Sequence, residues 1–102
     1  KTRKPVLVKF WAPWCGYCRA LAPALESIEK QYESLLSVGR VNFDTETALV
    51  RRYNIHALPT LLLFMNGAVA GFLIGPSSEK EIDAFLKKIL GLNAGGLYGK
   101  YV

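Results

Sequence analysis

One short stretch of this sequence restricts the fold more than any other: a strand-like apolar run stops at a proline and a helical pattern follows at once. Residues 6–11 have the composition of a buried strand, and Pro13 lies where that strand could not continue. From Cys15 onward, apolar residues recur at helical spacing as far as Leu35. A strand that is joined to the next strand through a helix is a basic unit of α/β folds. The chain is therefore predicted to be an α/β protein.

The rest of the chain continues to alternate strands and helices. Asn66-Gly67 is typical of a two-residue hairpin turn, so the apolar segments on its two sides are expected to pair antiparallel. Ser78 followed by Glu81 has the form of a capping box, which predicts where the last helix begins. The predicted strands are residues 6–11, 38–43, 60–65 and 68–74, and the predicted helices are 15–35, 46–53 and 78–89. This order favours a mixed sheet with helices on both faces.

At 102 residues, of which 51% are hydrophobic, the chain has the size and composition of one domain with its own core. Residues 1–90 carry all the predicted elements, whereas residues 91–102 contain four glycines and no clear period, so we expect a Gly-rich C-terminal tail there. The sequence begins at a lysine, which suggests a processed or excised piece. A cytoplasmic or organellar location is slightly favoured, with an exported or membrane-tethered protein as the alternative.

Charge and hydropathy favour neither a nucleic acid nor a membrane as a partner. Lys and Arg outnumber Asp and Glu by 13 to 8, but the basic residues are spread along the chain and form no stripe interleaved with exposed aromatic residues. We therefore expect solvated charged surfaces and no nucleic acid partner. No apolar run approaches the roughly 20 residues that span a bilayer, so no membrane contact is expected within this segment. The chain is expected to be monomeric.

The only two cysteines, Cys15 and Cys18, are separated by two residues at the start of the first predicted helix. A zinc site usually needs about four ligands, yet there is no second cysteine pair and His56 is the only histidine. Haem attachment requires a histidine directly after the second cysteine, where Arg19 stands. No metal site is therefore predicted. Two interpretations remain: a redox pair, or two inert buried thiols.

The redox interpretation explains where the pair lies. Residues three apart on a helix share one face, so the two sulfur atoms are close enough to form a disulfide. The helix N-terminus would lower the pKa of the Cys15 thiol, which makes Cys15 the predicted nucleophile. Cys18, one turn deeper, is predicted to resolve the mixed disulfide between Cys15 and a substrate. The redox-active disulfide is then the only cofactor that the chemistry requires.

The run from Val8 to Cys18, which ends in Trp14-Cys15-Gly16-Tyr17-Cys18, resembles the active-site strand and helix start of thioredoxins and protein disulfide isomerase domains. The further matches at the family's spacing are Pro23, Leu58-Pro59-Thr60, Asn66-Gly67 and Gly75. The resemblance implies a thioredoxin-like fold, with a mixed central sheet of about four strands flanked by three helices. The family's usual first strand and first helix are missing.

The resemblance also implies exchange with the disulfides or thiols of other proteins, and a partner, not identified by the sequence, that recharges the pair. In the family, the proline of Leu58-Pro59 follows a cis peptide bond, which presents the backbone of Leu58 to an extended substrate. An apolar rim around Cys15 is expected from Trp14, Leu58, Ile74 and Pro76. The predicted substrate-binding residues are Trp14, Gly16, Tyr17, Leu58, Pro59, Ile74 and Gly75.

Two residues depart from the family pattern at the site. Tyr17 stands where thioredoxins commonly have proline and isomerase domains histidine, and we expect its hydroxyl to face solvent. Lys9 stands at the strand position of a buried acid. We expect Lys9 to point toward the underside of the cysteine pair and to extend its charge into water, since a buried ammonium is unfavourable. Lys9 is predicted to tune the pair by raising its reduction potential.

These observations favour a thiol–disulfide oxidoreductase that reduces protein disulfides. A disulfide oxidant or isomerase would use the same residues at a different potential, and a peptide-binding, chaperone-like module would use the same groove without turnover. The presence of both cysteines favours the enzyme. The sequence alone leaves the direction of electron flow open.

Overall fold

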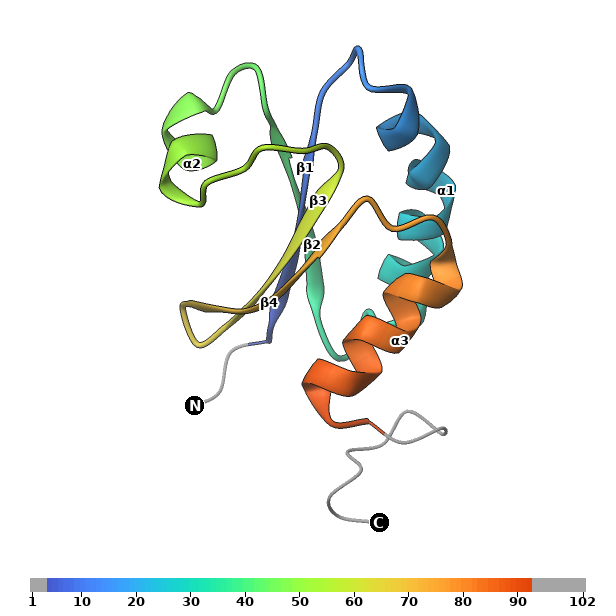
Figure 1. Cartoon of the computed structure of the whole chain (residues 1–102). Helices are drawn as coiled ribbons and strands as arrows, with labels where there is room; N and C mark the ends of the chain where they lie inside the picture. Colours follow the sequence, from blue (N-terminus) through green and yellow to red (C-terminus); the bar gives the residue numbers. More distant parts are fainter. Residues whose placement is uncertain (1–3, 93–102) are drawn as a thin grey trace.

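The computed structural model describes residues 4–92. Four strands form one sheet in the order β2-β1-β3-β4, in which β1 and β2 are parallel and the other neighbours antiparallel (Figure 1). The strands are β1 (Val6–Trp11), β2 (Ser37–Asn42), β3 (Thr60–Met65) and β4 (Ala68–Ile74). The helices are α1 (Gly16–Gln31), α2 (Thr47–Arg52) and α3 (Glu79–Leu90). The predicted mixed sheet and the predicted order of elements are confirmed.

The sequence predicted the hairpin correctly but predicted the end of α1 too far along the chain. Both hairpin strands have the predicted bounds, and Asn66 and Gly67 have the positive φ angles, 55° and 82°, that a two-residue turn between twisted strands requires. The helical spacing of apolar residues continues to Leu35, but α1 ends at Gln31. Tyr32 caps α1, and its carbonyl accepts the N–H of Leu35 in a turn. Leu35 therefore reaches the core from a turn, which happens to preserve the helical spacing.

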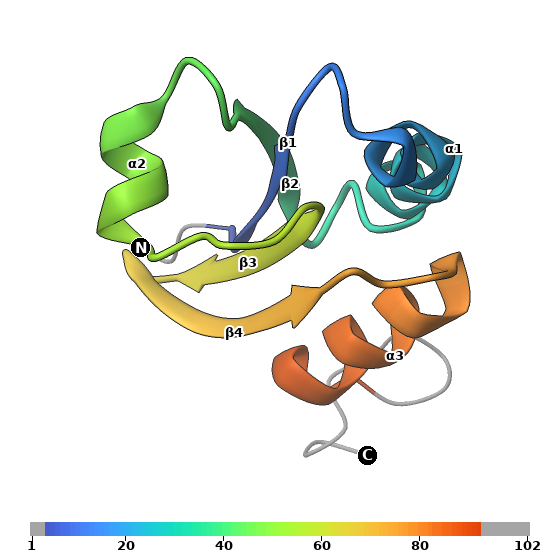
Figure 2. The same ribbon diagram turned by 45° about the horizontal axis from the view of Figure 1, so that its top comes forward.

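Alternation along the strands divides the apolar side chains between two cores. On one face, Leu7, Leu61 and Leu63 pack with residues of α1 and α3. On the other face, Phe10 and Leu62 form a smaller cluster beneath α2. Figure 2 shows α1 and α3 on one side of the sheet and α2 on the other. Because β1 is an inner strand that is covered on both faces, the loop that follows it starts from a fixed position.

The α2 face of the sheet is covered only in part. Helix α2 has six residues, and beside it a hollow of about 410 Å³ opens over β3 and β4. Three residues of β4 line this hollow with large exposed fractions: Val69 with 43%, Phe72 with 63% and Ile74 with 57%. The edge strand β4 therefore presents apolar side chains to solvent.

Helix α3 begins at the capping box that the sequence predicted. The hydroxyl of Ser78 accepts the N–H of Glu81 at 3.2 Å, and the Glu81 carboxylate reaches back to the N–H of Ser77 at 2.8 Å. Gly91 ends the helix with a φ of 70°, and Leu92 still packs into the main core. Packing thus continues two residues beyond the predicted domain boundary, and residues 93–102 of the predicted tail lie outside the described residues. Among residues 4–92, no helix combines the length and the apolar character needed to cross a membrane.

Candidate active site

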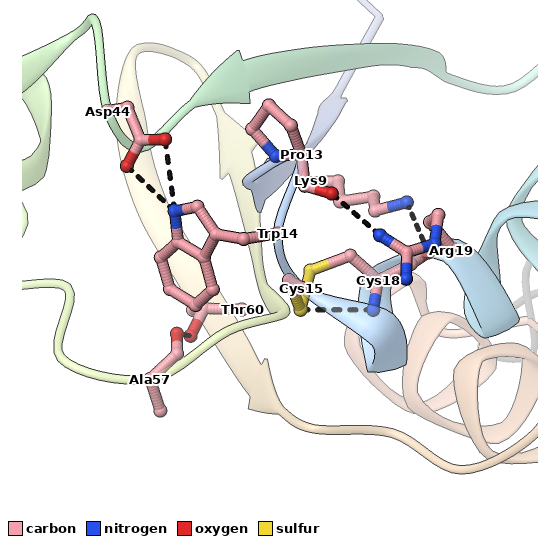
Figure 3. The surroundings of a disulfide bond; sticks show 9 residues. All are labelled: Lys9, Pro13, Trp14, Cys15, Cys18, Arg19, Asp44, Ala57 and Thr60. Carbon is pink, nitrogen blue, oxygen red and sulfur yellow. Dashed lines mark hydrogen bonds between the residues drawn. A yellow bond between two sulfur atoms is a disulfide. The ribbon is translucent and has the colours of Figure 1, made fainter.

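The two cysteines lie where β1 ends and α1 begins (Figure 3). After β1 the chain turns, and the N–H of Cys15 donates to the carbonyl of Ala12 at 3.1 Å. Cys15 is the N-cap of α1, and its Sγ accepts a hydrogen bond from the N–H of Cys18 at 3.1 Å. The two cysteines form a disulfide, with their Cα atoms 5.3 Å apart. The structure therefore brings the predicted redox pair together at the predicted place.

The disulfide is largely covered, but the residues between the cysteines are open to solvent. Cys15 and Cys18 have exposed fractions of 6% and 2%, whereas Gly16 is exposed. Tyr17 has an exposed fraction of 65%, in agreement with the prediction for this residue. The residues packed around the pair are Ala12, Trp11, Phe43 and Leu58. The first turn of α1 contains no acidic residue, so no carboxylate there offsets the positive end of the helix dipole. This environment favours a thiolate at Cys15 once the disulfide is reduced.

Lys9 approaches the pair from the middle of β1. Its side chain lies on the α1 face of the sheet, and its Nζ donates to the carbonyl of Cys18 at 3.0 Å (Figure 3). The predicted direction toward the cysteines is confirmed, but the expectation that its charge extends into water is wrong, because only 6% of Lys9 is exposed. Helix α1 covers the strand at this point, and the carbonyl in its first turn gives the ammonium a partner inside the protein.

The charges around Lys9 do not compensate its ammonium. Burial lowers the pKa of Lys9 below its usual value, and the positive charge of Arg40 on the neighbouring strand lowers this pKa further, while Glu26 acts in the opposite direction. Arg40 itself forms an ion pair with Glu29, with an Nη2–Oε1 distance of 2.9 Å. Among residues 4–92, Lys9 has no ion pair. The partner of the Lys9 ammonium is thus a backbone carbonyl and not a carboxylate.

Two polar contacts fix the loop after β1, and sequence reasoning identified neither. Trp14, whose exposed fraction is 63%, donates from Nε1 to both carboxylate oxygens of Asp44 at 3.1 and 3.0 Å, and its ring meets Phe43 edge-on. Arg19 donates from Nη1 to the carbonyl of Pro13 at 2.6 Å. The position of Asp44 contains a usable signal: it follows β2, and the carboxyl ends of parallel neighbouring strands lie at the same edge of a sheet.

The loop before β3 lies against the cysteines from another side. Leu58 packs on the pair, and the Leu58–Pro59 peptide bond is cis, as the family resemblance implied. Within residues 4–92, neither the N–H nor the C=O of Leu58 has a backbone hydrogen-bond partner. The residues after it are held firmly, since the Pro59 carbonyl accepts the N–H of Gly75 at 2.8 Å and the Thr60 hydroxyl donates to the carbonyl of Ala57 at 2.6 Å. An unpaired backbone segment therefore lies beside the disulfide.

The Thioredoxin family profile matches residues 1–88. This chain belongs to the thioredoxin family. A thioredoxin of Acidithiobacillus ferridurans is 43% identical over 86 residues, which cover 84% of this chain and 80% of the relative. A thioredoxin of Buchnera aphidicola is 41% identical over 90 residues, covering 88% of this chain and 83% of the relative. The solved structure of Deadhead, a germline-specific thioredoxin of Drosophila melanogaster, shares the fold with a TM-score of 0.78 and 24% identity, over 83% of this chain and 80% of that chain.

Family membership confirms the predicted fold and the predicted class of activity. The chain is a thiol–disulfide oxidoreductase that acts on protein disulfides. In the part of the chain that the structure describes, no group of three or more His, Cys, Asp or Glu side chains is placed to hold a metal ion. The individual roles of the site residues stay predictions.

Two hollows are lined by further residues that the sequence placed at the site. Ile74 belongs to the hollow over β3 and β4, and Gly75 follows it with a φ of 57°. Tyr17 and Pro76 line a smaller hollow of about 50 Å³. Pro76 was expected in an apolar rim around Cys15, but it is almost fully buried and offers no open surface there. Pro76 lines the smaller hollow together with Ala20 and Leu21 of α1.

Proposed function

We propose that this chain is a protein disulfide reductase that attacks through Cys15 and is resolved by Cys18. The Cys15 thiolate attacks one sulfur of a substrate disulfide, a mixed disulfide forms, and the other substrate sulfur leaves as a thiolate. Cys18, as a thiolate, then attacks Cys15, and the second substrate sulfur leaves. The substrate has gained two electrons, and the pair has become the Cys15–Cys18 disulfide. In this scheme the disulfide is the only cofactor.

The observation that carries the proposal is the position of Cys15 at the N-cap of α1. Its sulfur accepts the N–H of Cys18 at 3.1 Å, and the same N–H is available to stabilise a negative charge there after reduction. Cys15 is flanked by the exposed residues Trp14 and Gly16, whereas Cys18 lies within the helix and is 2% exposed. These surroundings support attack by Cys15 and resolution by Cys18.

The loops around the pair supply a surface for an extended substrate. Among residues 4–92, the N–H and C=O of Leu58 beside the disulfide have no backbone hydrogen-bond partner, so a substrate segment can pair with them as an added strand would. The hydrogen bond between Pro59 and Gly75 holds this segment in place. The other residues that we assign to the substrate surface are Trp14, Gly16, Tyr17 and Ile74. Main-chain pairing would give affinity with little demand on the substrate's sequence.

Reduction is the proposed direction of electron flow. The relatives that are 37–43% identical are thioredoxins, and thioredoxin has a reduction potential of about −270 mV as a general reference value. Recharging then requires a dithiol partner of similar or lower potential. A monomer is the proposed working unit.

Single-cysteine variants test the roles of the two thiols. Reduced Cys18→Ser, mixed with a disulfide protein such as insulin, should accumulate a mixed disulfide that added thiol releases, because attack proceeds and resolution cannot. Cys15→Ser, the matched control with the same loss of one thiol, should accumulate little or none. Adducts that form in Cys15→Ser but not in Cys18→Ser would reverse the assignment.

Turnover and potential distinguish the alternatives. The wild-type chain should reduce insulin catalytically in the presence of a small dithiol. Suppression of peptide aggregation without any such turnover would favour the chaperone-like module. A reduction potential of about −180 to −120 mV would favour an isomerase or oxidant.

A further inference from the structure

Lys9 places a cation beside the cysteine that becomes a leaving group when the disulfide is opened. Its Nζ lies 3.0 Å from the carbonyl oxygen of Cys18, and 6% of the residue is exposed. The carbonyl and the sulfur belong to the same residue, so the ammonium lies in the neighbourhood of the sulfur, where a charge on the sulfur would be only weakly screened. Among residues 4–92, no carboxylate forms an ion pair with Lys9. In the described part of the oxidised protein, Lys9 is therefore a buried cation without an ion-paired carboxylate.

Opening the disulfide creates a counter-ion for Lys9. An incoming thiolate of a dithiol partner attacks the Sγ of Cys15, a new disulfide forms between the partner and Cys15, and the Cys15–Cys18 bond breaks. The electron pair of the broken bond stays on the sulfur of Cys18, which becomes a thiolate. A negative charge thus appears next to Lys9, in surroundings where water screens the attraction only weakly.

We propose that Lys9 is a positioning residue for thiol–disulfide exchange, whose ammonium compensates the thiolate of Cys18 and thereby favours the reduced form of the pair. The inference deepens the proposed function and rests on Cys15 as the sulfur that is attacked. Stabilising the reduced form raises the reduction potential, so Lys9 makes the pair a weaker reductant than it would be without the charge.

The other charged groups around Lys9 have other partners or lie elsewhere, so the ammonium of Lys9 is the charge that we assign to this role. Arg40, its neighbour on β2, is directed to Glu29 on the exposed side of α1. Glu26, also on α1, favours the charged form of Lys9 but forms no ion pair with it. Arg19 is directed to a backbone carbonyl in the loop after β1. A thiolate at Cys18 raises the pKa of Lys9 and Lys9 lowers the pKa of the thiol, so the two titrations are coupled.

Lys9→Met tests the proposal, because methionine keeps much of the buried stem and removes the charge. The full chain is equilibrated with reduced and oxidised glutathione at neutral pH. Reduction of the variant should be less favourable by about tenfold, which corresponds to about 30 mV in potential. The matched control is Lys4→Met, which removes the same charge from an exposed lysine whose Nζ donates to the carbonyl of Glu33. An unchanged potential in Lys9→Met, or an equal shift in Lys4→Met, overturns the proposal.

Lys9→Gln separates the charge from the hydrogen bond. Glutamine can still donate to the carbonyl of Cys18, so a shift like that of Lys9→Met is expected if the charge acts. A wild-type potential in Lys9→Gln would show that the hydrogen bond acts instead, and would overturn the proposal.

Single-cysteine backgrounds locate the effect on one sulfur. With Cys15→Ser as background, Lys9→Met should raise the pKa of the Cys18 thiol, followed by the ultraviolet absorbance of the thiolate. With Cys18→Ser as background, the same change should shift the pKa of Cys15 less, and a larger shift at Cys15 contradicts the assignment. These measurements use no protein substrate, so failure of this inference can be distinguished from failure of the proposed reductase activity.

Discussion

Replacing Tyr32 with phenylalanine removes a hydroxyl that joins the two helices on one face of the sheet. Tyr32 caps α1, is 3% exposed, and donates its hydroxyl hydrogen to the carboxylate of Asp83 on α3. Lys87 binds the same carboxylate, with an Nζ–Oδ2 distance of 2.9 Å. Tyr32→Phe therefore keeps the buried ring and removes one charge-assisted hydrogen bond.

The loss of stability follows from the kind of bond removed. A hydrogen bond to a charged group contributes about 1.5–3 kcal/mol. Asp83 keeps Lys87 and is partly exposed, so we expect the lower value, about 1.5 kcal/mol, which is about 6–12 °C in Tm for a domain of this size. Thermal unfolding of the oxidised chain measures this decrease in Tm. Tyr17→Phe is the control, since the Tyr17 side chain is exposed, and it should change the free energy of unfolding by less than about 0.5 kcal/mol.

The pH dependence makes the test sharper. Burial alone would raise the pKa of Asp83, but the hydrogen bonds from Tyr32 and Lys87 bring it below its usual value. Burial and the bond to Asp83 raise the pKa of Tyr32. Asp83 thus contributes stability above an unfolded pKa of about 4 and loses it as pH falls through its folded pKa, whereas Tyr32 contributes stability below about 10 and loses it as pH rises through its folded pKa.

The difference in stability between wild type and Tyr32→Phe should therefore be largest from about pH 5 to 9 and decrease on both sides. A double-mutant cycle with Asp83→Asn should give a coupling energy well above 0.5 kcal/mol, because the two groups are in direct contact. A difference that does not vary with pH, or a coupling energy below about 0.3 kcal/mol, would refute this account.

Substitutions at two further positions address the site and the packing of α3. Asp44→Ala should release the Trp14 indole and raise KM for a protein disulfide several-fold, while the reduction potential stays unchanged. KM should rise less in Asp44→Asn, because asparagine keeps one acceptor for the indole. Gly71→Ala should lower the free energy of unfolding by about 1 kcal/mol in urea titrations, because the new Cβ would meet Phe85 and Ile89 at 3.2 Å and these flexible side chains must shift. A stability equal to wild type would show that they accommodate the methyl group freely.

Features that depend on neighbouring residues in the sequence were predicted well. The Asn66-Gly67 turn defined both hairpin strands because its backbone conformation and the strand alternation are local properties. The end of α1 was predicted less well. Apolar spacing reports which residues face the core, and Leu35 faces the core from a turn after the helix has ended. Periodicity alone therefore cannot locate a helix end where a turn continues to supply the core.

The environment of Lys9 is a feature that could be predicted only with the tertiary structure. Alternation places it on the same face of β1 as Leu7, and this much follows from the sequence. Whether a lysine on that face reaches water depends on how closely a helix covers the strand and whether a carbonyl is near enough to bind the ammonium. Here α1 lies over β1, and the carbonyl of Cys18 is 3.0 Å from Nζ. The hydrogen bonds of Trp14 to Asp44 likewise join segments that are 30 residues apart in the sequence.

Two separate influences favour the reduced pair in this chain. The helix N-terminus acts on Cys15, through the N–H that already binds its sulfur, and the proposed effect of Lys9 acts on Cys18. Because both stabilise a thiolate, both raise the reduction potential of the pair. Each rise of about 30 mV lowers the equilibrium constant for reduction of a substrate disulfide about tenfold. Exposed or strained disulfides have higher potentials than buried structural ones. The proposed reductase should therefore reduce exposed or strained protein disulfides and leave stable structural disulfides intact, and comparing its equilibria with one substrate of each kind measures this selectivity.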